Sequence, residues 1–220
     1  MAYRDIMRIN DDFSQPSLIQ TQALPWVASP IPGVERKMLD RIGHEVARAT
    51  SLVRYQPGSS FSEHTHGGGE EFVVLAGTFE DESGIFPTGT YVRNPPTSSH
   101  TPSSTSGCTL FVKLWQFDLH DRTHCQLNMT AQLVQQAPGH RARVLHTDAS
   151  EHVTYHELAP YTALVIEPSN GIELLLLEGE LAYGHQTLHQ YDWLRLPKGS
   201  DLQIHTNTQS ACLWMKTGHL

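Results

Sequence analysis

Short apolar runs separated by turn residues make up most of the chain. The clearest are Glu70–Phe79 (EEFVVLAGTF) and Ile172–Leu181 (IELLLLEGEL). Runs of this length, bounded by Pro, Gly and Asn, are typical of β-strands joined by tight turns. We therefore expect an all-β protein of antiparallel strands, as in a sandwich or a barrel. The main turn signals are Gln56–Gly58, Pro87–Gly89, Ser169–Gly171 and Pro197–Gly199.

Two segments before the first strong run carry other patterns. Val34–Arg48 has appreciable helical propensity, but its charges alternate poorly for a helix, so a strand is the alternative. The first 33 residues hold four prolines, which makes an extended arm more natural than a helix. Trp26 and Ile31 are the expected anchors of this arm, against its own barrel or against a second subunit.

The chain contains an internal repeat of about a hundred residues, the size of a small barrel. Shifting the numbering by 102 places Glu71 on Glu173 and Gly77 on Gly179, and a shift of 103 places CTLFVK on ACLWMK. We expect two tandem domains with a boundary in 118–130. The first would be 1–119, an N-terminal arm plus a domain, and the second 128–220.

Composition restricts the kind of partner. The net charge is −8 at neutral pH, which argues against direct nucleic-acid binding. The chain has no apolar run of eighteen residues and no apolar region near its start, so neither a membrane span nor a signal peptide is expected. Three widely spaced cysteines suit a reducing compartment. These features together predict a cytoplasmic protein.

Three histidines and a carboxylate form the strongest chemical pattern. His64 and His66 are separated by one residue, so they lie on the same face if the segment is a strand. Three glycines follow and allow a tight turn that brings Glu70 back beside them. His100 offers a fourth ligand. Imidazole and carboxylate donors in this number suit a divalent transition metal. Glu71 is the alternative carboxylate if the turn places the chain one residue off.

The residues around these ligands resemble the cupin family. A first block reads Gly58-x5-His64-x-His66-x3-Glu70-x6-Gly77, and a second reads Gly89-x5-Pro95-x-Thr97-x2-His100. The segment from about 49 to 116 is most similar to the cupin domain of ChrR, a zinc-binding anti-sigma factor. This resemblance implies tandem cupin barrels of the double-stranded β-helix, or jelly-roll, type. It also implies that His64, His66, Glu70 and His100 bind one metal ion per chain.

The sequence departs from the family at several points. The second block usually reads Pro-x-Gly, and here Thr97 replaces the glycine; Ser104 stands where the block usually ends in Asn. ChrR proteins also carry an N-terminal helical zinc domain with a Cys-x2-Cys pair, which this chain lacks. The resemblance therefore supports the fold and the metal, and sigma-factor binding would need another surface.

The second repeat has lost most of the pattern. Ile166 and Pro168, or Glu167 and Ser169 in the other register, occupy the places of the paired histidines. Leu202 replaces His100, and of the four ligands we expect only a carboxylate, Glu173, to remain. The second domain is therefore expected to be a degenerate cupin without a metal.

A largely apolar pocket should surround the metal. The candidate lining residues lie in strand-like runs near the ligands, and which of them face inward depends on strand register. Arg93 would hold an anionic ligand if it faced the metal, and otherwise makes a surface ion pair. The candidates are Val53, Tyr55, Phe72, Val74, Arg93 and Phe111.

Two functions are consistent with such a site. The first is a regulatory or stress-sensing role in transcription, in which a small molecule or an oxidant reaches a zinc ion. The second is a metal-dependent dioxygenase or isomerase that acts on a small diketone-like compound, with iron, manganese or nickel in a shell that has open positions. The expected partners are thus a small ligand or oxidant and a second copy of the chain in a homodimer, with a sigma factor on weaker grounds. Neither direct nucleic-acid binding nor membrane contact is expected.

Overall fold

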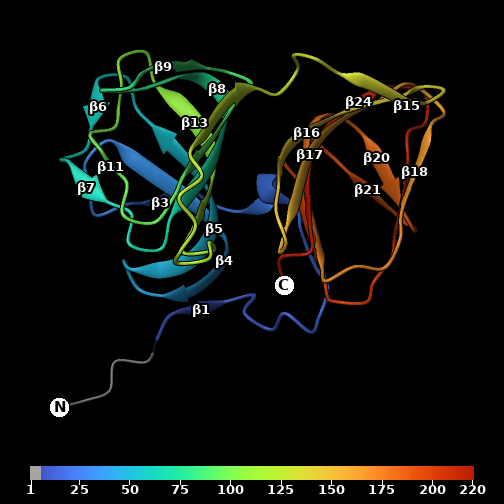
Figure 1. Cartoon of the computed structure of the whole chain (residues 1–220), viewed down its shortest axis with the longest axis horizontal. Helices are drawn as coiled ribbons and strands as arrows, with labels where there is room; N and C mark the ends of the chain where they lie inside the picture. The colour runs from blue at the N-terminus through green and yellow to red at the C-terminus, as the bar shows by residue number, and fades with distance from the viewer. Residues whose placement is uncertain (1–5) are drawn as a thin grey trace. The chain divides into compact units, whose positions relative to one another are not determined.

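The computed structural model describes residues 6–220, which contain β-strands and one short 3₁₀ turn at Thr21–Ala23 (Figure 1). These residues group into two compact units. The first joins Pro25–Asn128 with the chain up to Asp11, and the second joins Asp12–Leu24 with Met129–Leu220. Within the described part of the chain, no helix has the length and apolar character needed to cross a membrane.

The first unit consists of antiparallel strands. Its main path runs β1-β4-β5-β13-β8-β10-β14, and β7 and β11 form a separate two-stranded ladder. The strands are β1 (Arg8–Ile9), β3 (Val27–Ala28), β4 (Val34–Gly43), β5 (Ala47–Tyr55), β6 (Ser59–Ser60), β7 (His64–Thr65), β8 (Glu70–Asp81), β9 (Gly84–Pro87), β10 (Thr90–Asn94), β11 (Ser99–His100), β12 (Ser103–Ser104), β13 (Cys108–Leu114) and β14 (Cys125–Asn128).

The second unit consists of a seven-stranded sheet, β15-β16-β17-β24-β19-β22-β2, and a four-stranded sheet, β18-β23-β20-β21. Its strands are β2 (Ser17–Ile19), β15 (Val134–Ala137), β16 (His140–Thr147), β17 (His152–Leu158), β18 (Ala163–Ile166), β19 (Ile172–Gly179), β20 (Leu181–Tyr183), β21 (Gln186–Leu188), β22 (Trp193–Leu196), β23 (Leu202–His205) and β24 (Ala211–Thr217).

Residues of the N-terminal arm contribute to both units. Trp26 lies against the first unit, with its ring 4.3 Å from the Arg54 guanidinium and 5.0 Å from the Lys37 ammonium. Ile31 packs on the apolar cluster of the same unit. Ser17–Ile19, which the sequence placed with residues 1–119, pairs instead with β22 of the second unit. The pairing supplies backbone partners for an edge strand, which a local sequence pattern does not reveal.

Val34–Arg48 is extended rather than helical. Its first ten residues form β4, which pairs with β5 over nearly its full length and contains a bulge between Met38 and Asp40. Buried and partly exposed residues are mixed along the strand, and Leu39–Arg41 beside the bulge are all buried. Tertiary pairing therefore overrides the local helical propensity.

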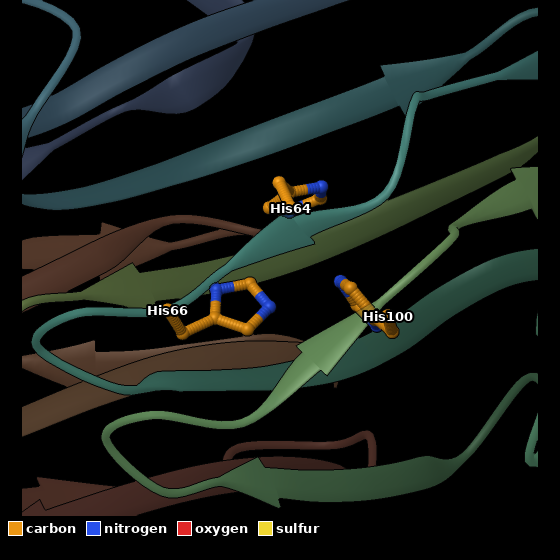
Figure 2. A group of neighbouring side chains, drawn as sticks. All are labelled: His64, His66 and His100. Atoms are coloured by element: carbon orange, nitrogen blue, oxygen red, sulfur yellow. The ribbon is translucent and has the colours of Figure 1, made fainter.

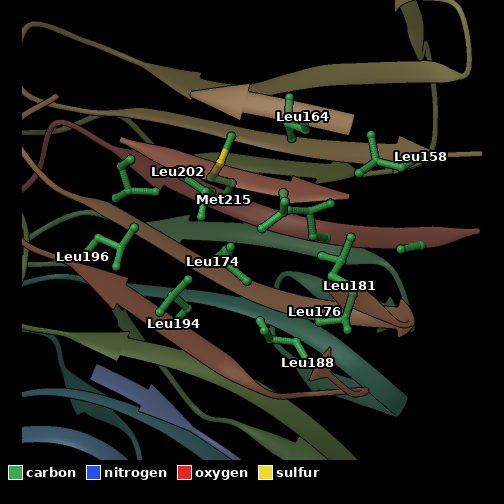
Figure 3. Packing of buried hydrophobic residues seen from close by; sticks show 14 residues of the cluster. Leu158, Leu164, Leu174, Leu176, Leu181, Leu188, Leu194, Leu196, Leu202 and Met215 are labelled. Carbon is green, nitrogen blue, oxygen red and sulfur yellow. The ribbon is translucent and has the colours of Figure 1, made fainter. Parts of the chain in front are cut away.

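Each unit has its own apolar core. In the first unit the core side chains come from alternate positions of β5, β8, β10 and β13, because alternate residues of a strand share one face. The second unit is filled mainly by leucine (Figure 3). Its buried members are Leu158, Leu164, Ile172, Leu174, Leu176, Leu181, Leu188, Leu194, Leu196, Leu202, Ile204, Ala211, Leu213 and Met215.

The internal repeat is visible in strand register. In the first unit Glu71 lies opposite Arg93 on one side and Lys113 on the other. In the second unit Glu173 lies opposite Arg195 and Lys216 in the same way. Glu173 is therefore the counterpart of Glu71 and not of Glu70. The expectation that Glu173 is the remaining metal carboxylate is wrong, because Ile172 occupies the position of Glu70.

The second unit buries a pair of histidines, His140 and His156, whose Nε2 and Nδ1 atoms lie 2.9 Å apart. The His156 Nε2 atom lies 2.8 Å from the Thr154 hydroxyl. Burial, with His140 nearby, lowers the pKa of His156 from its ordinary 6.5 to about 3. The folded protein therefore keeps this ring neutral at pH values where the unfolded chain is already protonated.

This pair gives a prediction for acid stability. Because the unfolded chain binds the extra proton below pH 6.5, the free energy of unfolding should fall as the pH drops, by roughly 2 kcal/mol between pH 7 and 5 for this ring. Urea denaturation across that range should show a flatter pH dependence for His156→Gln than for the wild type. The control His185→Gln replaces an exposed histidine and should keep the wild-type slope; equal slopes for the two variants would refute the assignment.

Candidate metal site in the first unit

The three histidines come together at the ladder of β7 and β11. His64 lies directly opposite His100 in this ladder. His66 follows β7, and its backbone is held on both sides: its N–H donates to the Ser98 carbonyl at 2.9 Å, and its carbonyl accepts from the Thr97 N–H at 2.9 Å. Figure 2 shows the three rings pointing toward one another. Thr97 itself has a left-handed φ of 77°, the conformation that glycine adopts most easily.

The donor atoms are close enough to share one ion. The ring centroids of the three histidines are 4.7–5.0 Å apart, and one nitrogen from each lies within 4.8 Å of the others. The Glu70 Oε2 atom is 3.4 Å from Nε2 of His66 and 3.6 Å from Nε2 of His100. Donors around a tetrahedral ion with bonds of 2.0–2.1 Å are about 3.3 Å apart. We call His64, His66, Glu70 and His100 the His–Glu site.

Hydrogen bonds on the far side of two rings orient them. The Nδ1 atom of His64 is 3.1 Å from the Ser62 carbonyl, and Nδ1 of His100 is 3.2 Å from Oδ2 of Asp81. A carbonyl accepts a hydrogen bond, so the proton of His64 lies on Nδ1, and the Asp81 carboxylate favours the same tautomer in His100. Both rings then keep the lone pair of Nε2 for a metal. A carboxylate behind a ligating histidine is the usual supporting arrangement in metal sites.

His66 provides the clearest indication of a missing ligand partner. Its Nε2 atom is buried and has no hydrogen-bond partner in the protein. Burial, with His64 beside it, lowers the pKa of His66 to about 4, so the ring is neutral at pH 7. A buried polar atom without a partner is unfavourable, and a metal ion would satisfy it. The donor set of three imidazoles and one carboxylate fits a divalent ion.

Glu70 rather than Glu71 belongs to the site. Burial raises the pKa of Glu70, and the neighbouring His100 opposes this shift. The side-chain amide of Asn94 donates to Glu70 Oε2 at 3.3 Å. Glu71 is on the opposite face of β8, where its carboxylate accepts from the Tyr91 hydroxyl at 2.5 Å. The glycine turn therefore places Glu70, and not Glu71, beside the histidines.

The turn between His66 and Glu70 is packed beneath two aromatic rings. A Cβ atom on Gly68 would lie 2.3 Å from the Trp115 ring, and one on Gly69 would lie 2.6 Å from Phe117. Gly69 also has a φ of +77°, which disfavours other residues. Close approach of backbone to ring thus fixes the distance between the second histidine and the carboxylate.

The His–Glu site opens into a cavity of about 410 Å³ within the first unit. Two of the candidate lining residues, Val53 and Tyr55, line this cavity. Phe72 and Val74 face the same side but lie in the apolar cluster behind it. The principal cavity walls are Val34, Val53, Tyr55, Phe61, Phe79, Leu110, Val112, Leu114 and Trp115.

Arg93 and Phe111 lie on the other face of their strands and not in the cavity. The Arg93 guanidinium is 2.9 Å from the Asp121 carboxylate, 3.8 Å from Glu71 and stacked 4.2 Å from the Phe117 ring. Phe111 lies under the Lys113 ammonium, 5.9 Å from it. Their neighbours Val92 and Val112 face the core instead. Because side chains alternate along a strand, residues that face the core and residues such as Arg93 and Phe111 point to opposite sides. The sequence did not reveal the register that decides between them.

Aliphatic residues replace the ligands in the second unit. Ile166 pairs with Leu202 in the β18–β23 ladder as His64 pairs with His100 in β7–β11. Leu202 and Ile172 belong to the buried leucine cluster, and Ile166 packs against it. Apolar side chains therefore fill the corresponding positions of this unit.

Asp81 is a site residue that the sequence did not indicate, because Asp81-Glu82 has the composition of an ordinary charged hairpin tip. It is the last residue of β8, while Glu70 is the first. Replacing Asp81 by asparagine should weaken metal affinity by about 10–100-fold, because His100 loses its charged hydrogen-bond partner. Competition with a chromogenic chelator would measure the change. The control is Glu63→Gln, which removes an exposed charge next to His64 in the sequence and should bind metal as the wild type does. An unchanged metal affinity of Asp81→Asn would contradict the supporting role of Asp81.

A family model matches one segment of the chain. Residues 14–118 match the family model described as the ChrR cupin-like domain. No curated protein sequence matches the chain.

Comparison with solved structures supports the same fold over nearly the whole chain. One is a putative dioxygenase from Nostoc punctiforme, with 14% identity, a TM-score of 0.73, and coverage of 94% of this chain and 84% of that one. Another is the bacterial pirin YhhW from Escherichia coli in complex with nickel(II), with 14% identity, a TM-score of 0.69, and coverage of 94% and 100%. A third is a salicylate 1,2-dioxygenase from Pseudaminobacter salicylatoxidans, with 12% identity, a TM-score of 0.64, and coverage of 94% and 85%. At these identities the likeness establishes the cupin fold.

Proposed function

We propose, from the premise that residues 14–118 form a ChrR cupin-like domain, that the His–Glu site binds one divalent metal ion and presents it to a small molecule. The observation that carries the proposal is the buried, unpartnered Nε2 atom of His66. It faces two further imidazoles and a carboxylate at the wall of an accessible cavity. A divalent ion in this position would supply a Lewis-acid centre for oxygen atoms of the bound molecule.

The protein's own groups prepare the site for this role. Ser62 and Asp81 hold two of the rings with Nε2 directed inward. The glycine turn beneath the two aromatic rings fixes the Glu70 carboxylate. The apolar walls limit the access of water, which strengthens the electrostatic interactions of the ligands. With three neutral imidazoles and one carboxylate, the site would carry a net charge of +1 when a divalent ion is bound.

Zinc is the expected ion by resemblance to the ChrR family, with iron, manganese and nickel as alternatives. Metal content of protein purified without chelator, followed by reconstitution with each ion in turn, tests this directly. We expect about one ion per chain, and a double replacement of His64 and His100 by glutamine should remove it. Retention of stoichiometric metal by the double variant would overturn the proposal.

We infer a regulatory role as the first candidate for the chain, in which access of a small molecule or an oxidant to the metal is the signal. The family of residues 14–118 supports it. The chain has no Cys-x2-Cys pair, so a sigma factor would have to bind another surface. Affinity capture with the metal-loaded protein and a purified sigma factor is the test. Binding that is lost on peroxide treatment would support the role, and no binding would remove the sigma factor as the partner.

A metal-dependent dioxygenase or isomerase is the second candidate, favoured by the 410 Å³ cavity that reaches the imidazoles. Two structures with the same fold carry the name dioxygenase. Oxygen consumption by iron-loaded protein in the presence of acetylacetone would support this activity on a diketone. The same rate in His100→Gln would show that the reaction does not use the site.

We also propose that the chain is a bicupin whose second barrel has lost its metal. The matching positions of Glu71 and Glu173, and of His64 and Ile166, in their strand ladders support this. Under this proposal the second unit stabilises the protein through its leucine core and takes no part in the chemistry.

A further inference from the structure

Arg36 contributes an unusual feature to the cavity of the first unit. Among the described residues that line this cavity it is the one lysine or arginine. It lies on β4 opposite Val53, which also lines the cavity. A cation in a wall that is otherwise mainly apolar needs a partner, since burial without one is unfavourable.

The guanidinium is only partly satisfied. Its Nη2 and Nη1 atoms lie 3.0 and 3.4 Å from the two carboxylate oxygens of Glu45, an end-on arrangement. Its Nε atom is buried and has no hydrogen-bond partner. A guanidinium has five N–H donors and can donate to a second carboxylate along the edge that contains Nε. That edge is the part of Arg36 that has no partner at its Nε atom.

The pair with Glu45 does not compete strongly for this residue. The Glu45 side chain is 63% exposed, whereas that of Arg36 is 19% exposed. An ion pair with one well-solvated partner contributes little. Burial lowers the pKa of Arg41, and repulsion from the nearby charge of Arg36 adds to this shift. Glu45, which also lines the cavity, interacts with both arginines, so two positive charges share one carboxylate at this wall.

The remaining walls indicate the body of the ligand. Valine, leucine and aromatic side chains line the same cavity as Arg36 and the imidazoles. A cavity of about 410 Å³ is near the small end of ligand pockets, which span about 300–1,000 Å³. The occupant must therefore be small, mainly apolar, and negatively charged at one place.

We propose that the cavity binds a small monocarboxylic acid with an aromatic or branched aliphatic body, and that Arg36 receives its carboxylate through the Nε edge. The proposal rests on the proposed function in one respect: the net charge of +1 expected for the metal-loaded His–Glu site also favours a monoanion. Arg36 is thus the residue that would select acids over neutral compounds of the same shape.

Titration calorimetry with benzoate and its neutral isostere benzamide tests this, using full-length zinc-loaded protein in low-chloride buffer. Benzoate should bind at least about tenfold more tightly than benzamide, the discrimination that one charged bidentate contact readily provides. Arg36→Gln should weaken benzoate binding about tenfold or more and leave benzamide unchanged. Arg36→Lys, which keeps the charge without the Nε edge, should fall between the wild type and Arg36→Gln.

The matched control is Arg54→Gln, which removes an arginine of the adjacent strand that pairs with Glu35 and does not line the cavity. It should leave both affinities unchanged. Equal affinity for benzoate and benzamide, an unaffected Arg36→Gln variant, or the absence of saturable benzoate binding at millimolar concentration would each overturn the proposal. Thermal unfolding of every variant identifies a loss caused by misfolding.

Parallel titrations of metal-free protein and of His100→Gln separate this inference from the proposed function. One outcome is that the wild-type chain takes up no metal but still binds benzoate in a way that depends on Arg36. This outcome would uphold the acid site and reject the metal site. Stoichiometric metal without acid selectivity would reject the acid site alone.

Discussion

Replacing His66 by leucine should abolish metal binding while leaving the metal-free protein folded and at least as stable as the wild type. The Nε2 atom of His66 is buried without a hydrogen-bond partner, and such an atom destabilises a fold by about 1–3 kcal/mol. Leucine removes that atom. It also removes a ligand, so affinity should fall by more than the roughly 100-fold expected from losing a ligand's hydrogen-bond partner.

Thermal unfolding of the metal-free and zinc-loaded forms measures both effects. The wild type should gain stability on loading, because an ion that binds only the folded state shifts the unfolding equilibrium. The His66→Leu variant should gain none. His185→Leu replaces an exposed histidine of the second unit and should respond to zinc as the wild type does. A metal-free His66→Leu protein that is clearly less stable than the wild type would mean that His66 has a structural partner.

Replacing Gly77 by alanine should be the most destabilising single-methyl change in the first unit. Gly77 has a φ of +72°, and a Cβ atom there would lie 2.1 Å from the Gly107 carbonyl oxygen. The left-handed conformation alone disfavours alanine by about 1–2 kcal/mol, and overpacking against backbone adds about 1–3 kcal/mol. Urea denaturation should therefore show a loss of roughly 3 kcal/mol or more in the transition of that unit.

Gly89→Ala separates the two causes. Gly89 has a φ of +87°, but a Cβ atom there would meet nothing within 4 Å. Its loss should be limited to the 1–2 kcal/mol of the backbone conformation. In the second unit Gly179 faces the Ser210 carbonyl oxygen at 2.0 Å, so Gly179→Ala should behave as Gly77→Ala does. Equal losses for Gly77→Ala and Gly89→Ala would show that the close contact relaxes freely.

The sequence indicates which candidate ligands lie close together where local geometry decides. One residue separates His64 from His66, and the glycine turn is three residues long. Both features place the candidate ligands without knowledge of the rest of the fold. The sequence predicts the lining less well, because the face of a strand depends on its register. Val53 and Tyr55 line the cavity, whereas Arg93 and Phe111 are one position away from residues that face the core.

Features that depend on distant pairing could not be predicted from local patterns. Asp81 supports His100 only because β8 is long enough to bring its last residue back to the ladder that contains His100. Ser17–Ile19 joins the second unit through β22, more than 170 residues later in the chain. Glu173 looked like a surviving ligand because aligning the repeats left two adjacent carboxylates to choose between, and register assigns it to the face of Arg195.

X-ray absorption at the metal edge, combined with elemental analysis of the same sample, tests the central claim most directly. The His–Glu site predicts about one ion per chain in a shell of nitrogen and oxygen, with the outer-shell scattering of imidazole from three histidines and no sulfur. A chain that takes up no ion after reconstitution, or an ion whose shell contains cysteine sulfur, would contradict it.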